Sequence, residues 1–315
     1  MKRILCVALF TFAATTALPS TAQESVAPPD LVGSWRLVGA QGNFDSDESR
    51  RGRGARGLLI LDRAGNAFEY FSATGGFGAD TSQATPESTL ANVGGFWGRF
   101  SVDPSAGRIA FAAESGVSPN VRGLEFTRQY ELDGDQLIVI SADEPHAQGN
   151  MRWTWQRMPV VENLSPAYRE VVGFWQHVEE RRVDTATGEV LNTSLRAPSL
   201  IVYTPSGFVG VHFPSVGRES VTTDTPSGED ARAALRGYIG YFGTLSVFPG
   251  EVSHNILSGV SPTTGSILRR YAEISGDELV VKLQNNGVRQ SGEGPRTVTE
   301  VILRRLSGAG DMLPD

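Results

Sequence analysis

The sequence predicts an all-β protein made of two consecutive antiparallel β-barrels, each with one short helix. A duplication is the first observation: Gly33-Ser34-Trp35 recurs as Gly173-Phe174-Trp175, which places the two tryptophans 140 residues apart (175 − 35). Gly116-Val117-Ser118-Pro119 recurs in the same way as Gly259-Val260-Ser261-Pro262. The second observation is that each copy divides into roughly eight short runs with the two-residue alternation of strands, separated by turn residues. This pattern favours closed antiparallel barrels over α/β units, with a β-sandwich as the main alternative.

The first residues are expected to be a secretion signal rather than part of the fold. Met1-Lys2-Arg3 is basic, residues 4–18 are apolar but too few to span a bilayer, and Ser20-Thr21-Ala22 supplies small residues before a cleavage site. We therefore predict a signal peptide over residues 1–22 and a secreted protein, with the periplasm as the expected compartment. Cys6 lies inside this segment, so the mature chain would contain no cysteine, and neither disulfides nor thiolate chemistry are predicted.

The chain is acidic, which excludes some classes of partner. Its formal charge of −7 becomes −9 once Lys2 and Arg3 are removed. Nucleic acids and anionic membrane surfaces are therefore poor partners, and the basic cluster at residues 50–56 is interpreted as a solvated loop. No later stretch predicts a transmembrane helix. We expect no nucleic-acid partner and no membrane span, and the sequence identifies no protein partner.

The first copy is predicted to occupy residues 27–158. Its first strand places Trp35 and Leu37 on one face, because side chains alternate along a strand. The following hairpin turns at Gly65, and Thr85-Pro86 predicts the start of a short helix, with threonine as the N-cap and proline at the first helical position. Further strands are expected at residues 96–103, 108–114, 124–132, 136–141 and 151–158.

The second copy is predicted at residues 166–307, after a linker at 159–165. It repeats the order of the first copy, with a short helix over residues 228–236. Its strands are expected at residues 172–179, 200–203, 208–213, 238–248, 252–257, 267–274, 279–284 and 298–306. Each barrel is therefore expected to contain about eight strands and one helix, as antiparallel barrels of this size do.

The start and end of each copy resemble the lipocalin/calycin barrels. In that family a Gly-x-Trp opens the first strand, and an arginine of the last strand packs across the tryptophan at the closed end. The resemblance pairs Trp35 with Arg157 in the first copy and Trp175 with Arg305 in the second. We assign these four residues to structure rather than to binding.

The second copy is similar in finer detail to the bacterial lipocalin-like domain family. It contains the hairpin Tyr203-Thr204-Pro205-Ser206-Gly207, the strand Gly237-Tyr238-Ile239-Gly240-Tyr241-Phe242-Gly243, and the hairpin strand that begins at Arg270. The first copy departs from both the tyrosine hairpin and the tyrosine strand. The resemblance covers nearly all of residues 31–306. It implies a barrel that holds small hydrophobic molecules and does not define an activity.

Interior residues decide what such a barrel holds, since it has room for side chains or for one small ligand. Side chains alternate between the two faces of a strand, and equivalent residues of the two copies must point to the same face. This alternation predicts that three histidines of the second copy face its interior. They replace Leu37, Tyr70 and Phe111 of the first copy, and they are His177, His212 and His254.

The inward orientation of His212 rests on its neighbour in the first copy. Glu69 corresponds to Val211, and a glutamate in an apolar barrel is not expected. Residue 69 should therefore face outward, and the positions of Tyr70 and His212 should face inward.

Three inward imidazoles allow three interpretations. They would be zinc ligands if they converged on one point, or acid–base groups if a substrate lay between them. The third interpretation, which we adopt, makes each a separate, hydrogen-bonded cavity histidine. We therefore predict no metal site, no cofactor and no catalytic residue.

One arginine, Arg270, and two tyrosines, Tyr203 and Tyr241, complete the candidate site. Arg128 and Arg270 occupy equivalent positions, and a buried guanidinium needs an internal glutamate, a ligand carboxylate or a bulge that turns it outward. Tyr241, at the position of Phe96, is expected to form a wall with one polar group. The predicted ligand-binding residues are His177, Tyr203, His212, Tyr241, His254 and Arg270.

The function predicted from the sequence is binding of a small, largely apolar molecule in the second barrel, with the first barrel more filled. One alternative is a barrel enzyme of the isomerase, cyclase or hydratase type that acts on a hydrophobic substrate with the histidines as acid and base. Another is an interaction module that presents residues 214–236 to a partner. Serine-hydrolase, P-loop, dinucleotide and zincin signatures are absent from the sequence.

Overall fold

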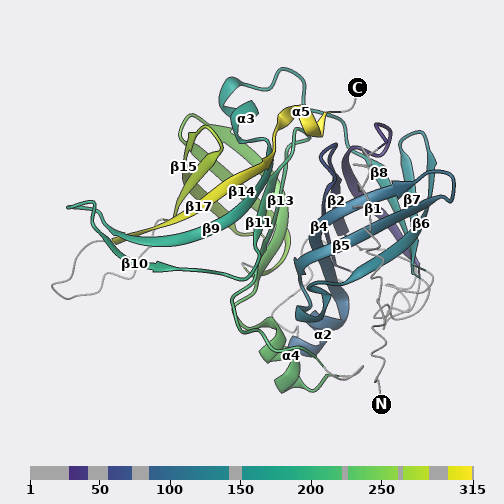
Figure 1. Ribbon diagram of the computed structural model, residues 1–315, viewed down its shortest axis with the longest axis horizontal. Coiled ribbons are helices and arrows are strands. Elements are labelled where there is room, and N and C mark those ends of the chain that lie inside the picture. The colour runs from purple at the N-terminus through teal and green to yellow at the C-terminus, as the bar shows by residue number, and fades with distance from the viewer. Residues whose placement is uncertain are drawn as a thin grey trace, which may run out of the picture.

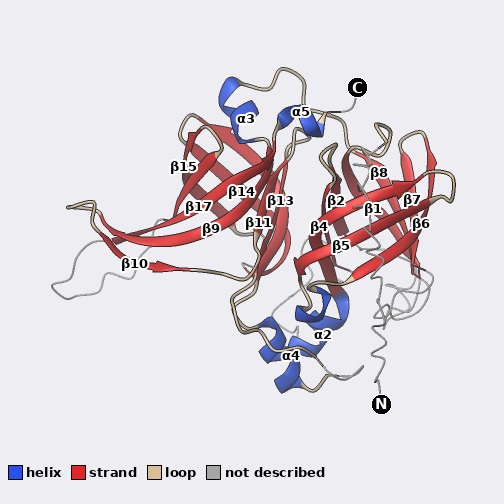
Figure 2. Cartoon of the chain, viewed as in Figure 1, coloured by secondary structure: helices blue, strands red, loops and turns tan. Residues whose placement is uncertain are grey.

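The computed structural model describes seven stretches of the chain: residues 28–41, 56–72, 85–141, 151–221, 226–261, 265–283 and 297–313. The predicted signal peptide at residues 1–22 and most of the basic cluster at 50–56 lie outside these stretches. Two antiparallel barrels stand side by side (Figures 1 and 2). We call the barrel formed by β1–β8 barrel 1, and the barrel formed by β9 and β11–β17 barrel 2.

Barrel 1 closes because its last strand, β8, pairs with β1. Its other neighbouring strands are consecutive in sequence, and all pairs are antiparallel. Because the sheet closes on itself, it has no free edge. Its strands are β1 (Gly33–Gln41), β2 (Arg56–Leu61), β3 (Asn66–Ser72), β4 (Val93–Asp103), β5 (Arg108–Gly116), β6 (Glu125–Asp133), β7 (Gln136–Ser141) and β8 (Met151–Arg157).

Barrel 2 repeats this order and closes through the pairing of β17 with β9. Its strands are β9 (Gly173–Asp184), β11 (Leu200–Tyr203), β12 (Phe208–Phe213), β13 (Ile239–Phe248), β14 (Glu251–Ser261), β15 (Ile267–Ser275), β16 (Glu278–Leu283) and β17 (Thr297–Ser307). The closure of both sheets confirms the predicted barrels and excludes a sandwich.

Barrel 2 has an extension that the sequence analysis did not predict. The extra strand β10 (Val190–Ser194) pairs with the distal half of β9, which runs on beside β17 beyond the barrel wall (Figure 1). All five residues of β10 are exposed. The expected strand at 172–179 is therefore too short, and β10 escaped prediction because it lacks the apolar alternation of a half-buried strand.

Four short α-helices lie in the described residues, so one helix per barrel was an underestimate. The two expected helices are α2 (Pro86–Asn92), capped by the Thr85 side chain, and α4 (Gly228–Leu235), which has a Ser227 capping box. The two additional helices are α3 (Pro166–Val171), which precedes β9, and α5 (Ala309–Met312), which follows β17. Both are a single turn or little more, and so they leave almost no periodic signal in the sequence.

Three clusters of buried apolar side chains hold the molecule together. Two are the interiors of the barrels, centred on Trp35 and Trp155 in barrel 1 and on Trp175 and Leu303 in barrel 2. The third lies between the barrels and takes residues from both, among them Phe68 from β3 and Phe242 from β13. The two barrels are thus packed on each other through a hydrophobic face rather than only tethered by a linker.

Equivalent surfaces of the two copies form this contact. Phe68 of β3 packs on Gly210, which is its own counterpart in β12, and a side chain at residue 210 would collide with the Phe68 ring. Tyr70 lies next to its counterpart His212, with 5.8 Å between ring centroids. The equivalent helices α2 and α4 also pack together (Figure 2). This is the pattern of a two-fold, isologous interface, here inside a single chain.

Candidate ligand site in barrel 2

The same arginine–tryptophan stack marks one end of each barrel. The Arg157 guanidinium lies 4.1 Å from the ring centroid of Trp35, and that of Arg305 lies 4.0 Å from Trp175. Arg305 also donates to the backbone oxygens of Val172 (3.2 Å) and Glu170 (2.9 Å). Each stack thus ties the first and last strands to the residues before the first strand. We refer to this end as the capped end, and the expected contacts are present in both copies.

Gly173 allows the chain to enter β9 beneath this cap. Its φ is +141°, a conformation that other residues rarely adopt, and a Cβ here would collide with the Ser307 backbone oxygen. The following tryptophan therefore lies directly under Arg305, and Trp175 Nε1 donates to Val171 O at 2.7 Å. This explains in physical terms the Gly-x-Trp pattern at the start of each copy.

The interior of barrel 1 contains a buried ion pair. Arg128 of β6 donates to Glu69 of β3 at 2.5 Å, and the two side chains are only 5% and 2% exposed. Aromatic rings surround the guanidinium, with Trp153 at 4.6 Å and Phe126 at 5.1 Å between centres. The interior of barrel 1 thus holds two opposite charges that neutralise each other among aromatic rings.

This pair contradicts the expectation that residue 69 faces outward. Strand register places Glu69 opposite Leu59 and Phe96, which both belong to the interior cluster of barrel 1. A glutamate is tolerated there because Arg128 supplies its charge partner across the barrel. The sequence did contain a usable signal, because the alternation of side chains places both Glu69 and Arg128 on the interior face of their strands.

Barrel 2 has a different interior at the equivalent positions. Val211 stands where barrel 1 has Glu69, opposite Ile201 and Tyr241. Several large rings of barrel 1 are replaced by smaller side chains. The pairs, barrel 1 first, are Tyr130 and Ala272, Phe126 and Leu268, Trp153 and Val301, and Trp155 and Leu303.

Polar groups in barrel 2 occupy positions that are apolar in barrel 1. His254 replaces Phe111, and its Nδ1 is 2.8 Å from the hydroxyl of Tyr241. Tyr203 replaces Leu61 and lies 5.5 Å from the His254 ring between centroids. All three side chains are buried. Three predicted site residues therefore lie together inside barrel 2.

Two atoms of this group lack a hydrogen-bond partner in the part of the chain that the structure describes. They are the hydroxyl of Tyr203 and Nε2 of His254. A buried polar group without a partner costs about 1–3 kcal/mol, and so such atoms are uncommon in folded proteins. Neither atom thus has its hydrogen-bonding capacity satisfied by the described part of the chain.

Arg270 lies on the same interior face, opposite Val252 and in line with Leu268 and Ala272. It donates to the backbone oxygen of its neighbour Arg269 at 3.0 Å. No carboxylate of the described residues pairs with it, in contrast to the equivalent Arg128.

Burial sets the protonation states of the group. Together with the positive charge of Arg270, it lowers the pKa of His254 to about 3. Burial raises the pKa of Tyr203 and of Tyr241, while Arg270 acts in the opposite direction on both. His254 is therefore neutral and both tyrosines are protonated at neutral pH.

His177 lies apart from this group, toward the end of the barrel opposite the cap. It pairs with the interior residue Leu303 and meets the Phe213 ring edge-on at 5.4 Å. Burial lowers its pKa, and Glu180 partly opposes this effect. Glu180 is itself bonded to Arg196 at 2.5 Å. This ion pair was not predicted, because Arg196 lies in an irregular segment.

His212 does not face the interior of barrel 2, which corrects the prediction. It lies in the cluster between the barrels, where Nδ1 is 2.5 Å from the Tyr238 hydroxyl and Nε2 is 2.9 Å from the backbone oxygen of Glu69. Burial lowers its pKa to about 4. The error has the same origin as the one for Glu69. Glu69 corresponds to Val211, the neighbour of His212 in β12, so a prediction that residue 69 faces outward also predicts that His212 faces inward.

The three histidines therefore do not converge on one point. Among the described residues, no three His, Cys, Asp or Glu side chains lie close enough together to hold a metal ion. The arrangement in which His177, His212 and His254 act together on one substrate is likewise not formed, since His212 is outside the barrel.

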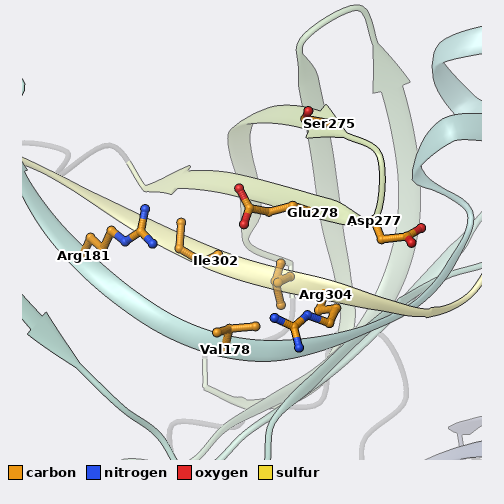
Figure 3. A pocket seen from close by; sticks show the side chains of 8 residues that line it. Val178, Arg181, Ser275, Asp277, Glu278, Ile302 and Arg304 are labelled. Carbon is orange, nitrogen blue, oxygen red and sulfur yellow. The ribbon is translucent and has the colours of Figure 1, made fainter.

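A hollow of about 380 Å³ lies elsewhere, where β9 and β17 pass the β15–β16 hairpin. Figure 3 shows its lining, which includes Arg181, Asp277, Glu278 and Arg304. Arg181 is paired with Glu179 at 2.5 Å, and Asp277 lies 3.6 Å from Arg305. This polar surface hollow does not include the interior group of barrel 2, and its lining does not suit an apolar ligand.

Within the described ranges, no helix is long and apolar enough to cross a membrane. Residues 172–306 match the model of the family described as lipocalin-like domain. No curated protein matches the chain significantly. The family match covers barrel 2 and agrees with the resemblance of its hairpin and tyrosine strand, and barrel 1 has the same strand order.

Proposed function

We propose that this chain, whose second barrel is a lipocalin-like domain, binds a small, largely apolar molecule inside that barrel. The observation that carries the proposal is the difference between the two interiors. Several interior tryptophan, phenylalanine and tyrosine rings of barrel 1 are replaced by smaller aliphatic side chains at the equivalent positions of barrel 2. The candidate residues are His177, Tyr203, Tyr241, His254 and Arg270.

The walls of barrel 2 support a mixed ligand that is mostly apolar. Aliphatic side chains such as Ile201, Val211 and Leu245 form most of the interior, and polar groups are few and gathered near His254. Ligand sites commonly combine an apolar lining with a small number of placed polar groups. His212 is not part of the proposed site because it lies between the barrels.

Titration of the full-length protein with a panel of lipophiles, followed by native mass spectrometry and calorimetry, tests the proposal. The panel would contain long-chain alcohols, acids, esters and retinoids. Val301→Trp copies Trp153 of barrel 1 and should weaken binding at least about tenfold by filling the interior. Ile267→Trp adds the same ring at an exposed position of β15 and should leave binding unchanged.

Two outcomes would overturn the proposal. One is that no member of the panel binds the wild-type protein. The other is that Val301→Trp, folded as judged by circular dichroism, binds as tightly as the wild type, because the ligand would then lie outside barrel 2.

The proposal includes secretion, on the basis of the predicted signal at residues 1–22. Expression of the full gene product followed by N-terminal sequencing of the exported protein should give a first residue of Gln23. Recovery of the intact N-terminus from the cytoplasm alone would contradict this part.

A further inference from the structure

The interior of barrel 1 contains a carboxylate that barrel 2 lacks. Glu69 lies within 2.5 Å of Arg128, and both are almost completely buried. In barrel 2 the arginine is retained as Arg270 on the equivalent strand, while Val211 replaces the glutamate. Barrel 2 thus keeps the arginine on its interior face and lacks the glutamate that neutralises it in barrel 1.

Hydrogen-bond donors take the place of apolar groups around the same position. Tyr203 and His254 stand where barrel 1 has Leu61 and Phe111, and both side chains are fully buried. The Tyr203 hydroxyl and His254 Nε2 have no partner among the described residues. The two rings lie 5.5 Å apart between centroids, so both atoms belong to one polar group rather than to separate sites.

The contact between Tyr241 and His254 determines what His254 offers. If the Tyr241 hydroxyl donates to Nδ1 across 2.8 Å, the neutral imidazole carries its proton on Nε2. That tautomer makes Nε2–H a donor directed away from Tyr241. The Tyr203 hydroxyl and the Arg270 guanidinium are donors as well, so all three groups suit an acceptor that carries negative charge.

Resting on the proposed function, we infer that the ligand of barrel 2 carries a carboxylate, which Arg270, Tyr203 and His254 bind in place of the glutamate that barrel 1 supplies from its own chain. The apolar part of the ligand then lies along the aliphatic wall that includes Val211, Ile201 and Leu245. The expected ligand is a long-chain or cyclic carboxylic acid. The alcohol or ester of the same skeleton lacks the charge that the site requires.

A matched set of probes separates this inference from the proposed function. Laurate, dodecanol and methyl laurate have the same chain and differ only in the head group. Calorimetry on the full-length protein should show laurate binding about tenfold to a hundredfold more tightly than the other two, which is the usual range for a charge-assisted hydrogen bond. If no probe binds, the proposed function fails. If all three bind alike, only the carboxylate inference fails.

Two substitutions at the site make the test sharper. Arg270→Gln should abolish the preference for laurate over dodecanol, because it removes the charge that distinguishes the two head groups. Arg269→Gln is the matched control, because it removes the same charge from the exposed, outward face of the same strand. A preference for laurate that survives Arg270→Gln would overturn the inference.

Val211→Glu provides an independent test that adds the carboxylate instead of removing the arginine. It recreates in barrel 2 the pair formed by Glu69 and Arg128, so it should exclude laurate at least about tenfold more than dodecanol. Equal loss of both probes would indicate that the variant is only overpacked, and Val211→Gln, which has the same shape without the charge, measures that effect. Laurate binding equal in Val211→Glu and Val211→Gln would contradict the inference.

Discussion

Arg128 in barrel 1 is neutralised by Glu69, whereas its equivalent in barrel 2, Arg270, faces Tyr203 and His254 and no carboxylate of the described residues. The surrounding shells are nearly the same. Both have an arginine stacked on a tryptophan at the capped end, and both close through the first and last strands. The comparison shows that the residues that build a barrel and those that fill it vary independently after duplication. Differences between the interiors therefore carry functional information that the shared shell does not.

Replacing Glu69 by valine tests the comparison most severely, because it gives barrel 1 the residue of barrel 2. Arg128 would lose its carboxylate while remaining buried, and removal of one member of a buried pair costs about 3–5 kcal/mol. We expect the free energy of unfolding in urea to fall by about that amount. The double variant Glu69→Val with Arg128→Met should recover most of the loss. Equal destabilisation in the single and double variants would show that packing, not charge, stabilises this interior.

A second prediction concerns how the stability of the protein depends on pH through His212, which lies at the contact between the barrels beside Tyr70. Burial lowers the pKa of His212 to about 4 in the folded protein, from the ordinary histidine value of 6.5. The unfolded chain therefore binds a proton at higher pH than the folded chain does. Stability is complete above about pH 7 and falls as pH decreases toward 4, by about 3 kcal/mol for this residue.

His212→Gln should flatten this pH dependence, since glutamine can keep a polar contact with Tyr238 without titrating. Urea unfolding at several pH values between about 7 and 4.5 measures the slope. His254, whose pKa is lowered to about 3, contributes in the same direction and remains in the variant. An unchanged slope in His212→Gln would contradict the assignment.

The smallest expected effect concerns the capped ends, where the two barrels should behave alike. Arg157→Met and Arg305→Met each remove a guanidinium stacked on tryptophan together with its bonds to backbone oxygens. Each should lower the free energy of unfolding by about 1–2 kcal/mol. Arg304→Met, at the adjacent exposed position, should change it by less than about 0.5 kcal/mol. Markedly unequal losses at the two caps would show that the shells are not equivalent.

Much of the fold could be predicted from the sequence because the duplication supplied each strand twice. The hairpins at Gly65 and Gly207 and the helices after Thr85 and Ser227 follow from local chemistry, and the structure confirms them. Strand β10 and the far half of β9 could not be found, because both faces of β10 are exposed and the two-residue alternation is absent.

The candidate site could be predicted only in part, because the positions of the wrongly predicted residues depend on contacts between distant parts of the chain. The inward position of His254 followed from the apolar character of its counterpart Phe111. The sequence predicts the wrong face for His212, because Glu69 reads as a lone charge until the structure shows its partner Arg128. Only the folded barrel brings Arg128 to it, and the burial of Tyr70 and His212 likewise depends on a second barrel that packs outside the first.

The packing of each copy on the surface of the other has a consequence for how the protein loses its structure. Phe68 is seated on Gly210, and Trp97 Nε1 donates to the backbone oxygen of Pro198 at 3.2 Å, so separating the barrels would expose rings that are now buried between them. Neither half is therefore expected to persist once its sister has melted. Heating should produce one shared transition, and a chain cut between residues 159 and 165 should keep its halves associated as a non-covalent pair.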